Sequence, residues 1–365
     1  MDNFVGIYIH IPFCKRKCNY CAFVSVCDFS LQRDYVKALI REIESRKNVN
    51  EKVSTIYVGG GTPSTLYSGG LHEILSTVKK CFNVIDDAEI TVEVNPESFT
   101  PDFAKECKEN GVNRISMGVQ SSNEKYLTYA GRLHDVDAVK KAINLANSVG
   151  ITNVSGDLIY GFNGQTISDV IADVNFLKGM PFTHVSTYAL SIEKGTPFYE
   201  SQEITNDDLQ ADMYEEIAKI LTCDGWDRYE VSNFAKYGRY SRHNDKYWKR
   251  VNYLGFGASA HSLYNDVRWA NTDSVKDYID GKIEQERTVL TKEDVREETV
   301  MLSLRTKDGL DLDFYKNKFG VDLLNEKNDK IKTLVDAVFL IVDNKRLIVT
   351  QKGVFVLNYI ITELI

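Results

Sequence analysis

The sequence has no long apolar run and no excess of positive charge. No stretch approaches the roughly 20 apolar residues of a membrane-spanning helix, and the opening MDNFVGIYIHIP lacks the basic and apolar segments of a secretory signal. The 44 basic and 52 acidic residues give a net charge of -8, which excludes bulk electrostatic attraction to nucleic acid. We therefore expect a cytoplasmic protein without a nucleic-acid partner, and transient contact with a membrane stays open.

The chain also lacks internal repeats, low-complexity tracts and a disulfide framework. Its seven cysteines are odd in number and unevenly spread, with three of them crowded at Cys14, Cys18 and Cys21. This is not the pattern of a secreted, disulfide-stapled domain, so reduced thiols are available as ligands. At 365 residues and 43% hydrophobic content, the chain can form a large domain, alone or with a small one.

Short β-branched or aromatic runs alternate with helical patterns through the first two thirds of the chain, which is typical of βα units in a parallel sheet. Six strands are predicted over residues 6–12, 55–60, 89–94, 114–120, 153–161 and 184–191. Helices are predicted near 29–47, 69–81, 101–110, 135–149, 167–179 and 206–223. Six units are fewer than the eight of a closed barrel, so this α/β region is predicted to form a partial (β/α)6 TIM-like barrel with an open side.

The pattern changes after about residue 230. Residues 231–290 are aromatic and glycine-rich, contain HNDKYW, and are interpreted as a connecting segment after a core of residues 1–230. From 291 to 365, helical patterns near 311–319 and 326–339 precede a short β-hairpin and a last helix. This order predicts a small, helical, winged-helix-like C-terminal domain.

Residues suited to ligand binding follow the predicted strands. In parallel α/β folds, ligands bind beyond the carboxyl ends of the strands. The three cysteines follow the first strand, GGGTP (59–63) follows the second, and the later strands carry Glu93, Gln120, Asp157 and Ala189 at or near their ends. The chemistry is therefore expected at this end of the sheet.

The cysteine spacing is C-x3-C-x2-C. A short loop of this kind brings three thiolates around one small cluster, and three ligands for a four-iron cluster leave one iron open to a substrate. A zinc site completed by Cys27 or His10 is the alternative for the triplet alone.

CKRKCNYC, directly after the strand YIHIP, resembles the signature of the radical S-adenosylmethionine (SAM) superfamily. The resemblance implies a [4Fe-4S] cluster on Cys14, Cys18 and Cys21, with SAM on the open iron and an electron donor for the cluster. It implies that GGGTP contacts the SAM amino group, carboxylates hold ribose hydroxyls, and an arginine pairs the methionine carboxylate. The SAM contacts implied are Tyr8, His10, Tyr20, Gly60, Gly61, Thr62, Glu93, Gln120, Arg132, Asp157 and Ala189. Tyr8 and His10 alternate on the first strand and so point to one face, although a core role for Tyr8 is also open.

Several segments look like one branch of this superfamily, which contains oxygen-independent coproporphyrinogen III dehydrogenases and heme chaperones. They are YIHIPFC, GGGTPS, RISMGVQS, DLIYGFNGQT and MLSLRTKDGLDLDFYKNKFG. The dehydrogenases have a further cysteine two residues after the third one, and a longer segment before the cluster. This chain has Phe23 there and only 13 residues before Cys14. Phe23 is expected to pack beside the loop, and the missing thiol is the evidence against the dehydrogenase.

HNDKYW, from His243 to Trp248, resembles the H-N-x-x-Y-W motif of the heme chaperones. The resemblance implies that His243 is a heme ligand, since imidazole is the usual protein ligand of heme iron. A hydrogen-bonded surface or interface histidine is the alternative. His261 in GASAHS ranks below His243, because this stretch has Ser259 where the family often has glycine.

Together these features predict a heme chaperone that binds a [4Fe-4S] cluster, SAM and heme and delivers heme to respiratory hemoproteins. The alternative is an oxygen-independent coproporphyrinogen III dehydrogenase of porphyrin biosynthesis, which decarboxylates propionate side chains, and a zinc scaffold is a third class. Homodimer formation, SAM cleavage and the mode of heme attachment stay open. His72, His134 and His184 carry no motif and are predicted to be polar surface or loop residues.

Overall fold

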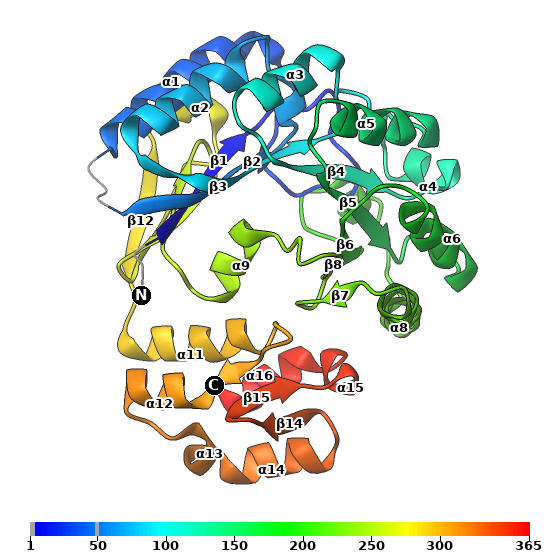
Figure 1. The fold of residues 1–365 in the computed structure, drawn as a ribbon, viewed down its shortest axis with the longest axis vertical. Coiled ribbons are helices and arrows are strands. Elements are labelled where there is room, and N and C mark those ends of the chain that lie inside the picture. Colours follow the sequence, from blue (N-terminus) through cyan, green and yellow to red (C-terminus); the bar gives the residue numbers. More distant parts are fainter. Residues whose placement is uncertain (1–3, 48–50) are drawn as a thin grey trace.

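A long curved sheet forms the larger part of the molecule (Figure 1). A computed structural model describes residues 4–47 and 51–365 of the chain. The central strands are β1 (Phe4–Ile11), β2 (Lys52–Gly60), β3 (Asn83–Val94), β4 (Arg114–Gln120), β5 (Asn153–Tyr160) and β6 (His184–Ala189). They pair in chain order and run parallel, which confirms the six predicted strands.

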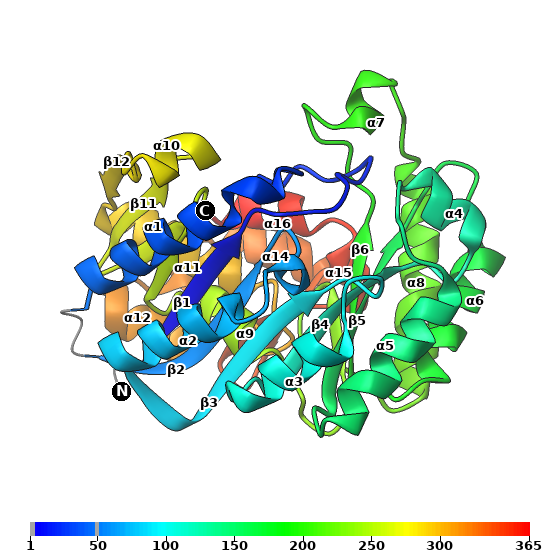
Figure 2. The ribbon, with the colours of Figure 1, turned by 90° about the horizontal axis from the view of Figure 1, so that it is seen from above.

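Helices cover the outer face of this sheet (Figures 1 and 2). The helices that join or follow the strands are α1 (Gln32–Ser45), α2 (Gly70–Cys81), α3 (Pro101–Glu109), α5 (Val136–Ser148), α6 (Ile167–Lys178) and α8 (Asp207–Cys223). Polar side chains cap the starts of α3, α5 and α6, where Thr100, Asp135 and Thr166 accept backbone N–H groups of the first turn. All six predicted helices are therefore present, whereas the short α4 (Glu124–Tyr129) and α7 (Pro197–Glu200) were not predicted.

The two faces of strand β1 have different surroundings, one in the apolar core and one toward the interior of the barrel. Ile7, Ile9 and Ile11 are fully buried and belong to the main apolar core. Tyr8 and His10 alternate with them, as expected, and their side chains are joined by a hydrogen bond of 3.0 Å. The sheet thus has an apolar outer face under the helices and a polar inner face.

Further strands extend the sheet at both edges. Next to β1 lies β9 (Tyr253–Phe256), which is parallel to it, followed by the antiparallel β10 (His261–Tyr264), β11 (Val267–Asn271) and β12 (Glu284–Val289). Next to β6 lie the short β8 (Asn233–Ala235) and β7 (Asp227–Arg228). Much of the region interpreted as a connecting segment is therefore paired with the sheet. It also contains α10 (Val275–Ile279) and α9 (Arg242–Trp248), and α9 lies on the concave side of the sheet (Figure 1).

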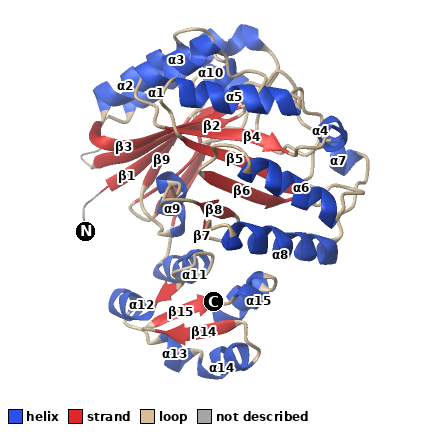
Figure 3. Cartoon of the chain, turned by 45° about the vertical axis from the view of Figure 1, so that its right-hand side comes forward, coloured by secondary structure: helices blue, strands red, loops and turns tan. Residues whose placement is uncertain are grey.

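The C-terminal region has its own apolar core and its own small sheet (Figure 3). Its helices are α11 (Lys292–Ser303), α12 (Leu312–Phe319), α13 (Leu323–Glu326), α14 (Asn328–Asp336), α15 (Gln351–Val354) and α16 (Leu357–Leu364). Its strands are β13 (Leu310–Asp311) and the hairpin of β14 (Leu340–Asp343) and β15 (Arg346–Val349). The predicted order of helices, hairpin and last helix is confirmed. Within the described residues, no helix combines the length and apolarity needed to span a bilayer.

Candidate functional site

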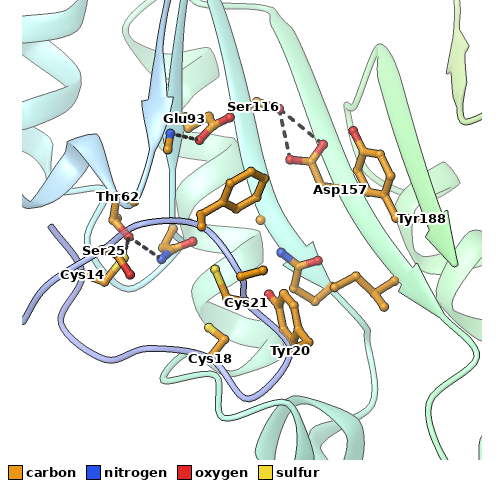
Figure 4. A pocket seen from close by; sticks show the side chains of 18 of the residues that line it. Cys14, Cys18, Tyr20, Cys21, Ser25, Thr62, Glu93, Ser116, Asp157 and Tyr188 are labelled. Atoms are coloured by element: carbon orange, nitrogen blue, oxygen red, sulfur yellow. Dashed lines mark hydrogen bonds between the residues drawn. The ribbon is translucent and has the colours of Figure 1, made fainter. Parts of the chain in front are cut away.

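A cavity of about 570 Å³ opens inside the barrel at the carboxyl ends of the parallel strands. Most of the residues predicted to bind the cluster or SAM line it. They are Cys14, Cys18, Tyr20, Cys21, Gly60, Gly61, Thr62, Glu93, Gln120, Arg132, Asp157 and Ala189. Tyr8, His10 and His243 are not among the lining residues. Figure 4 shows the cysteine loop on one side of the cavity, with Glu93, Asp157 and Tyr188 across from it.

The cysteine loop is held at its start and its end by backbone hydrogen bonds. The amide of Cys14 donates to Val26 O (3.0 Å), and the amide of Val26 donates to Pro12 O (2.7 Å). The ring of His10 contacts the cysteine loop, with its Nε2 2.9 Å from Val24 O. His10 therefore helps to hold the loop near its C-terminal end.

The environment of Cys14 and Cys21 opposes the ionisation of their thiols. Burial raises the pKa of Cys14, and hydrogen bonds from Thr62 and Ser25 only partly oppose this. Burial likewise raises the pKa of Cys21 to about 11, against a hydrogen bond from the Phe23 amide. Since metal ligation requires thiolates, binding of iron must displace these protons.

The thiols fit a cluster better than a single ion. Three cysteines line the same cavity. A structural zinc site needs four converging ligands, whereas a four-iron cluster spreads its ligands over several metal atoms. The residues present therefore suit a [4Fe-4S] group.

Glycines at the end of β2 let the side chains of His10 and Glu93 approach its backbone closely. Gly60 has a φ of 103°, and a Cβ there would lie 2.3 Å from the His10 ring. A Cβ on Gly59 would lie 2.6 Å from the Glu93 carboxyl carbon. The glycine loop is therefore required by the packing of His10 and Glu93, besides the SAM contact that the family resemblance implies.

Two carboxyl groups face the cavity from inside the barrel. Glu93 accepts hydrogen bonds from Tyr57 Oη (2.7 Å) and from the Gly60 amide (2.9 Å), while burial raises its pKa to about 7. Asp157 accepts a hydrogen bond from Ser116 Oγ (3.1 Å), and burial raises its pKa. Both groups would be more readily ionised if a ligand with positive charge or hydroxyl donors entered the cavity.

Arg132 already has partners in this structure. Its Nη2 donates to Asn95 Oδ1 (2.7 Å) and to Gly118 O (2.9 Å), and its Nη1 lies 3.5 Å from Cys18 Sγ. Its Nε is buried and has no hydrogen-bond partner within the described part of the chain. Arg132 is thus close enough to the cysteine loop to contact a ligand there, although it is not free of other contacts.

The loop after β4 is strained and firmly held. Gln120 has a φ of 68°, in the left-handed region that favours glycine. The next two residues are anchored by the buried Asp173, which accepts hydrogen bonds from Ser121 Oγ (3.0 Å) and Ser122 Oγ (2.7 Å). Sequence reasoning missed Asp173, which lies on α6, about 50 residues from the loop it holds.

Sequence reasoning also missed the residues deep in the cavity. Arg114 is 1% exposed, lines the cavity, and has an Nε and an Nη1 without hydrogen-bond partners in the described chain. The signal was available, because Arg114, Ser116, Gly118 and Gln120 alternate along β4 and all line the cavity. Asn244, from HNDKYW, reaches the cavity from α9.

His243 lies in a different environment from the cysteines. It is 1% exposed, its Nδ1 is 2.9 Å from Thr55 Oγ1, and its Nε2 is 2.8 Å from Tyr247 Oη. Its amide donates to Glu89 (3.0 Å), and burial lowers the imidazole pKa to about 3. Neither ring nitrogen is free in this arrangement, so heme ligation by His243 stays a prediction that requires one hydrogen bond to break.

Three other predictions need correction. Phe23 does not pack beside the loop: it is 66% exposed and lines the cavity. His134 and His184 are buried, and the ring of His184 bridges Ser155 and Tyr229 with two contacts of 2.8 Å. These rings lie at polar positions inside the fold, which the absence of a motif could not reveal. His261 is exposed on β10, and Ser259 nearby has a φ of 60°, which explains a preference for glycine there.

Comparisons with known proteins agree with this site. The sequence profile of the Radical SAM superfamily matches residues 8–177, and that of the HemN C-terminal domain matches residues 290–356. The chain is 35% identical to the heme chaperone HemW of Lactococcus lactis over 355 residues, which cover 95% of this chain and 93% of that protein. It is 34% identical to the heme chaperone HemW of Bacillus subtilis, with 87% of each chain covered.

A solved structure has the same fold. Coproporphyrinogen III oxidase (HemN) from Escherichia coli, described as a radical SAM enzyme, superposes with a TM-score of 0.86 at 23% identity. The match covers 99% of this chain and 89% of that one. At this identity the likeness establishes the α/β radical SAM fold and its C-terminal domain, and nothing about activity.

Proposed function

Because the chain belongs to the HemW family within the radical SAM superfamily, we propose that it binds heme and acts as a heme chaperone. The observation that carries this proposal is the similarity to proteins named heme chaperone HemW along almost the whole chain. The position of Phe23, where the dehydrogenases have a cysteine, supports it. Respiratory hemoproteins are the proposed acceptors, while the electron donor and self-association stay predictions.

The family implies a [4Fe-4S] cluster and SAM, and the cavity contains residues suited to both. Cys14, Cys18 and Cys21 would hold the cluster, which supplies one-electron chemistry toward SAM when bound. Glu93 and Asp157 are placed to accept hydrogen bonds from ligand hydroxyls. The loop after β2 would bind a ligand amino group through its backbone, since only glycine permits this close approach.

We propose His243 as the heme ligand after a local rearrangement of α9. Its Nε2 becomes available when the Tyr247 hydroxyl moves away, while the contact with Thr55 can still orient the ring. Tyr247→Phe removes the competing hydroxyl and should speed heme binding, whereas His243→Ala should abolish it. His261→Ala tests the lower-ranked candidate and should leave heme binding unchanged, because its ring is exposed on β10. Stopped-flow absorbance in the Soret region measures these rates, and unchanged heme affinity in His243→Ala would contradict the assignment.

The alternative function is oxygen-independent coproporphyrinogen III dehydrogenation. One cluster-loaded preparation tests both functions under anaerobic conditions. Heme titration should show saturable binding, and incubation with SAM, a reductant and coproporphyrinogen III should give no steady product. Continuous formation of protoporphyrinogen would establish the enzyme instead, and a colourless, zinc-containing protein after reconstitution with iron and sulfide would contradict the cluster.

A further inference from the structure

A chain of polar side chains connects two of the three cluster cysteines. Thr62 Oγ1 donates to Cys14 Sγ (3.3 Å), and Asn95 Nδ2 donates to Thr62 Oγ1 (3.0 Å). Asn95 Oδ1 accepts from Arg132 Nη2 (2.7 Å), and Arg132 Nη1 donates to Cys18 Sγ (3.5 Å). Figure 4 shows Thr62 beside Cys14, with the dashed line from Thr62 to the neighbouring amide. Asn95 is the central member, and no role follows for it from the cysteine spacing or the strand-end pattern.

The direction of every hydrogen bond in this chain is determined by Arg132. A guanidinium has only donors, so the amide oxygen of Asn95 must face it and the amide nitrogen must face Thr62. Thr62 Oγ1 thus accepts a hydrogen bond from Asn95, and its own proton is left to donate to Cys14. The amide of Asn95 therefore orients the hydroxyl of Thr62 toward the sulfur.

The members of this chain are held in place. Thr62 is 2% exposed. The carbonyl of Asn95 accepts the amides of Ser98 (3.0 Å) and Phe99 (3.1 Å), which fixes the turn after β3. The amide of Thr62 donates to Phe13 O (2.8 Å), next to Cys14. Because these backbone hydrogen bonds do not involve the Asn95 side chain, the direction of its side-chain hydrogen bonds can change without breaking them.

Hydrogen bonds to a cluster thiolate stabilise the additional negative charge of the reduced cluster and so raise its reduction potential. We propose that Asn95 is a positioning residue that turns the Thr62 hydroxyl toward Cys14 and thereby raises the reduction potential of the cluster on the three cysteines. The inference rests on the cluster assigned through the family and does not depend on heme binding.

A double-mutant cycle tests this role. Asn95→Asp presents only acceptors, so the Thr62 hydroxyl must turn away from Cys14, and Thr62→Val removes that hydroxyl. Reduction potentials are measured by EPR-monitored titration of cluster-loaded protein without SAM or heme. Both single variants should shift the potential to more negative values. The shift caused by Asn95→Asp should be smaller in the Thr62→Val background, because only its charge then acts.

Two controls isolate the effect. Thr62→Ser keeps the hydroxyl and should retain the wild-type potential. Ser98→Ala removes a hydroxyl that contacts the Asn95 carbonyl at 3.1 Å but takes no part in the hydrogen bonds between Asn95, Thr62 and Cys14. This variant should also retain the wild-type reduction potential. Equal shifts from Asn95→Asp in both backgrounds would overturn the positioning role, as would an unchanged potential in Thr62→Val.

Iron content and charge-transfer absorption establish that each variant carries a cluster. If Asn95→Asp does not assemble one, Asn95→Leu replaces it in the same cycle, with a smaller negative shift expected because the hydroxyl loses its orientation without an added charge. A wild-type protein that binds heme but assembles no cluster would overturn this inference and leave the heme proposal standing.

Discussion

The two ends of the barrel are both lined with polar side chains, but they use them differently. At the cysteine end, thiols and carboxyl groups face a cavity, and burial shifts the pKa of Cys21 and Glu93 strongly upward. At the α9 end, His243 has hydrogen bonds to Thr55, Tyr247 and Glu89. The groups at the cysteine end already face an open cavity, whereas a ligand of His243 must first displace one of its hydrogen bonds. Changes at the two ends should therefore affect different properties.

The largest expected effect is loss of the cluster. Cys18→Ser removes one of three ligands and should abolish iron binding after anaerobic reconstitution, because the C-x3-C-x2-C loop then supplies only two thiolates. The free energy of unfolding of the cofactor-free protein should change little. Iron analysis and visible absorbance measure the first property, and urea unfolding measures the second. Cys27→Ser is the control, since Cys27 is exposed and should not be needed; iron retained by Cys18→Ser would contradict the ligand set.

At the α9 end, a substitution is expected to lower the stability of the protein and to leave the cluster in place. His243→Ala leaves the hydroxyls of the buried Thr55 and the half-buried Tyr247 without their partner and creates a cavity, which should lower the free energy of unfolding by about 3 kcal/mol. Cluster loading should be retained. Urea unfolding followed by circular dichroism provides the measurement. A variant with wild-type stability and no cluster would reverse the comparison.

A smaller effect depends on pH. The pKa of Glu93 is about 7 in the folded protein against an ordinary value of 4.5, so the folded state binds the additional proton between these values. The contribution of Glu93 to stability should therefore fall as the pH rises from 5 to 8, whereas the glutamine of Glu93→Gln does not titrate. From pH 5 to pH 8, the unfolding free energy of Glu93→Gln should therefore rise by about 2 kcal/mol relative to that of the wild type. Unfolding of cofactor-free protein at both pH values measures it, with the exposed Glu109→Gln as a variant that should show no such change.

The smallest effect concerns the loop after β4. Asp173→Asn weakens the hydrogen bonds that hold Ser121 and Ser122, so Gln120 should lose its position at the cavity. We expect the dissociation constant of SAM to rise about tenfold, which corresponds to roughly 1.4 kcal/mol. Calorimetric titration of cluster-loaded protein provides the value. Asp137→Asn, on the exposed face of α5, should bind SAM as the wild type does, and an unchanged affinity in Asp173→Asn would exclude the role.

The parts of the fold that were predicted from sequence depend on local patterns. The six parallel strands and their helices follow from alternating apolar residues and helix periodicity, which are visible within each segment. Strands β9 to β12 were missed. The first of them, β9, pairs with a strand from the other end of the sequence, since Gly6 of β1 lies opposite Tyr253.

The residues of the candidate site were likewise predictable only where they belong to local sequence patterns. The cysteine spacing and the strand ends indicate most of the residues that line the cavity. Asn95 was missed because its hydrogen bonds with Thr62 and Arg132 form only on folding, whereas the alternation along β4 did indicate Arg114. HNDKYW identified an unusual segment but not its environment, since the partner of His243 at Thr55 is 188 residues away in the chain. The motifs thus indicated which residues belong to the site, whereas only the structure showed the hydrogen-bond partners of those residues.

Strand β1 lies inside the sheet, between β2 and β9. During synthesis, residues 6–9 therefore have one open edge until residues 253–256 have left the ribosome. The cysteine loop follows this strand directly, so its support is completed only when about two thirds of the chain has been made. Iron loading is consequently expected after translation of the barrel, and a nascent chain stopped before β9 should expose an unpaired strand that is prone to aggregation.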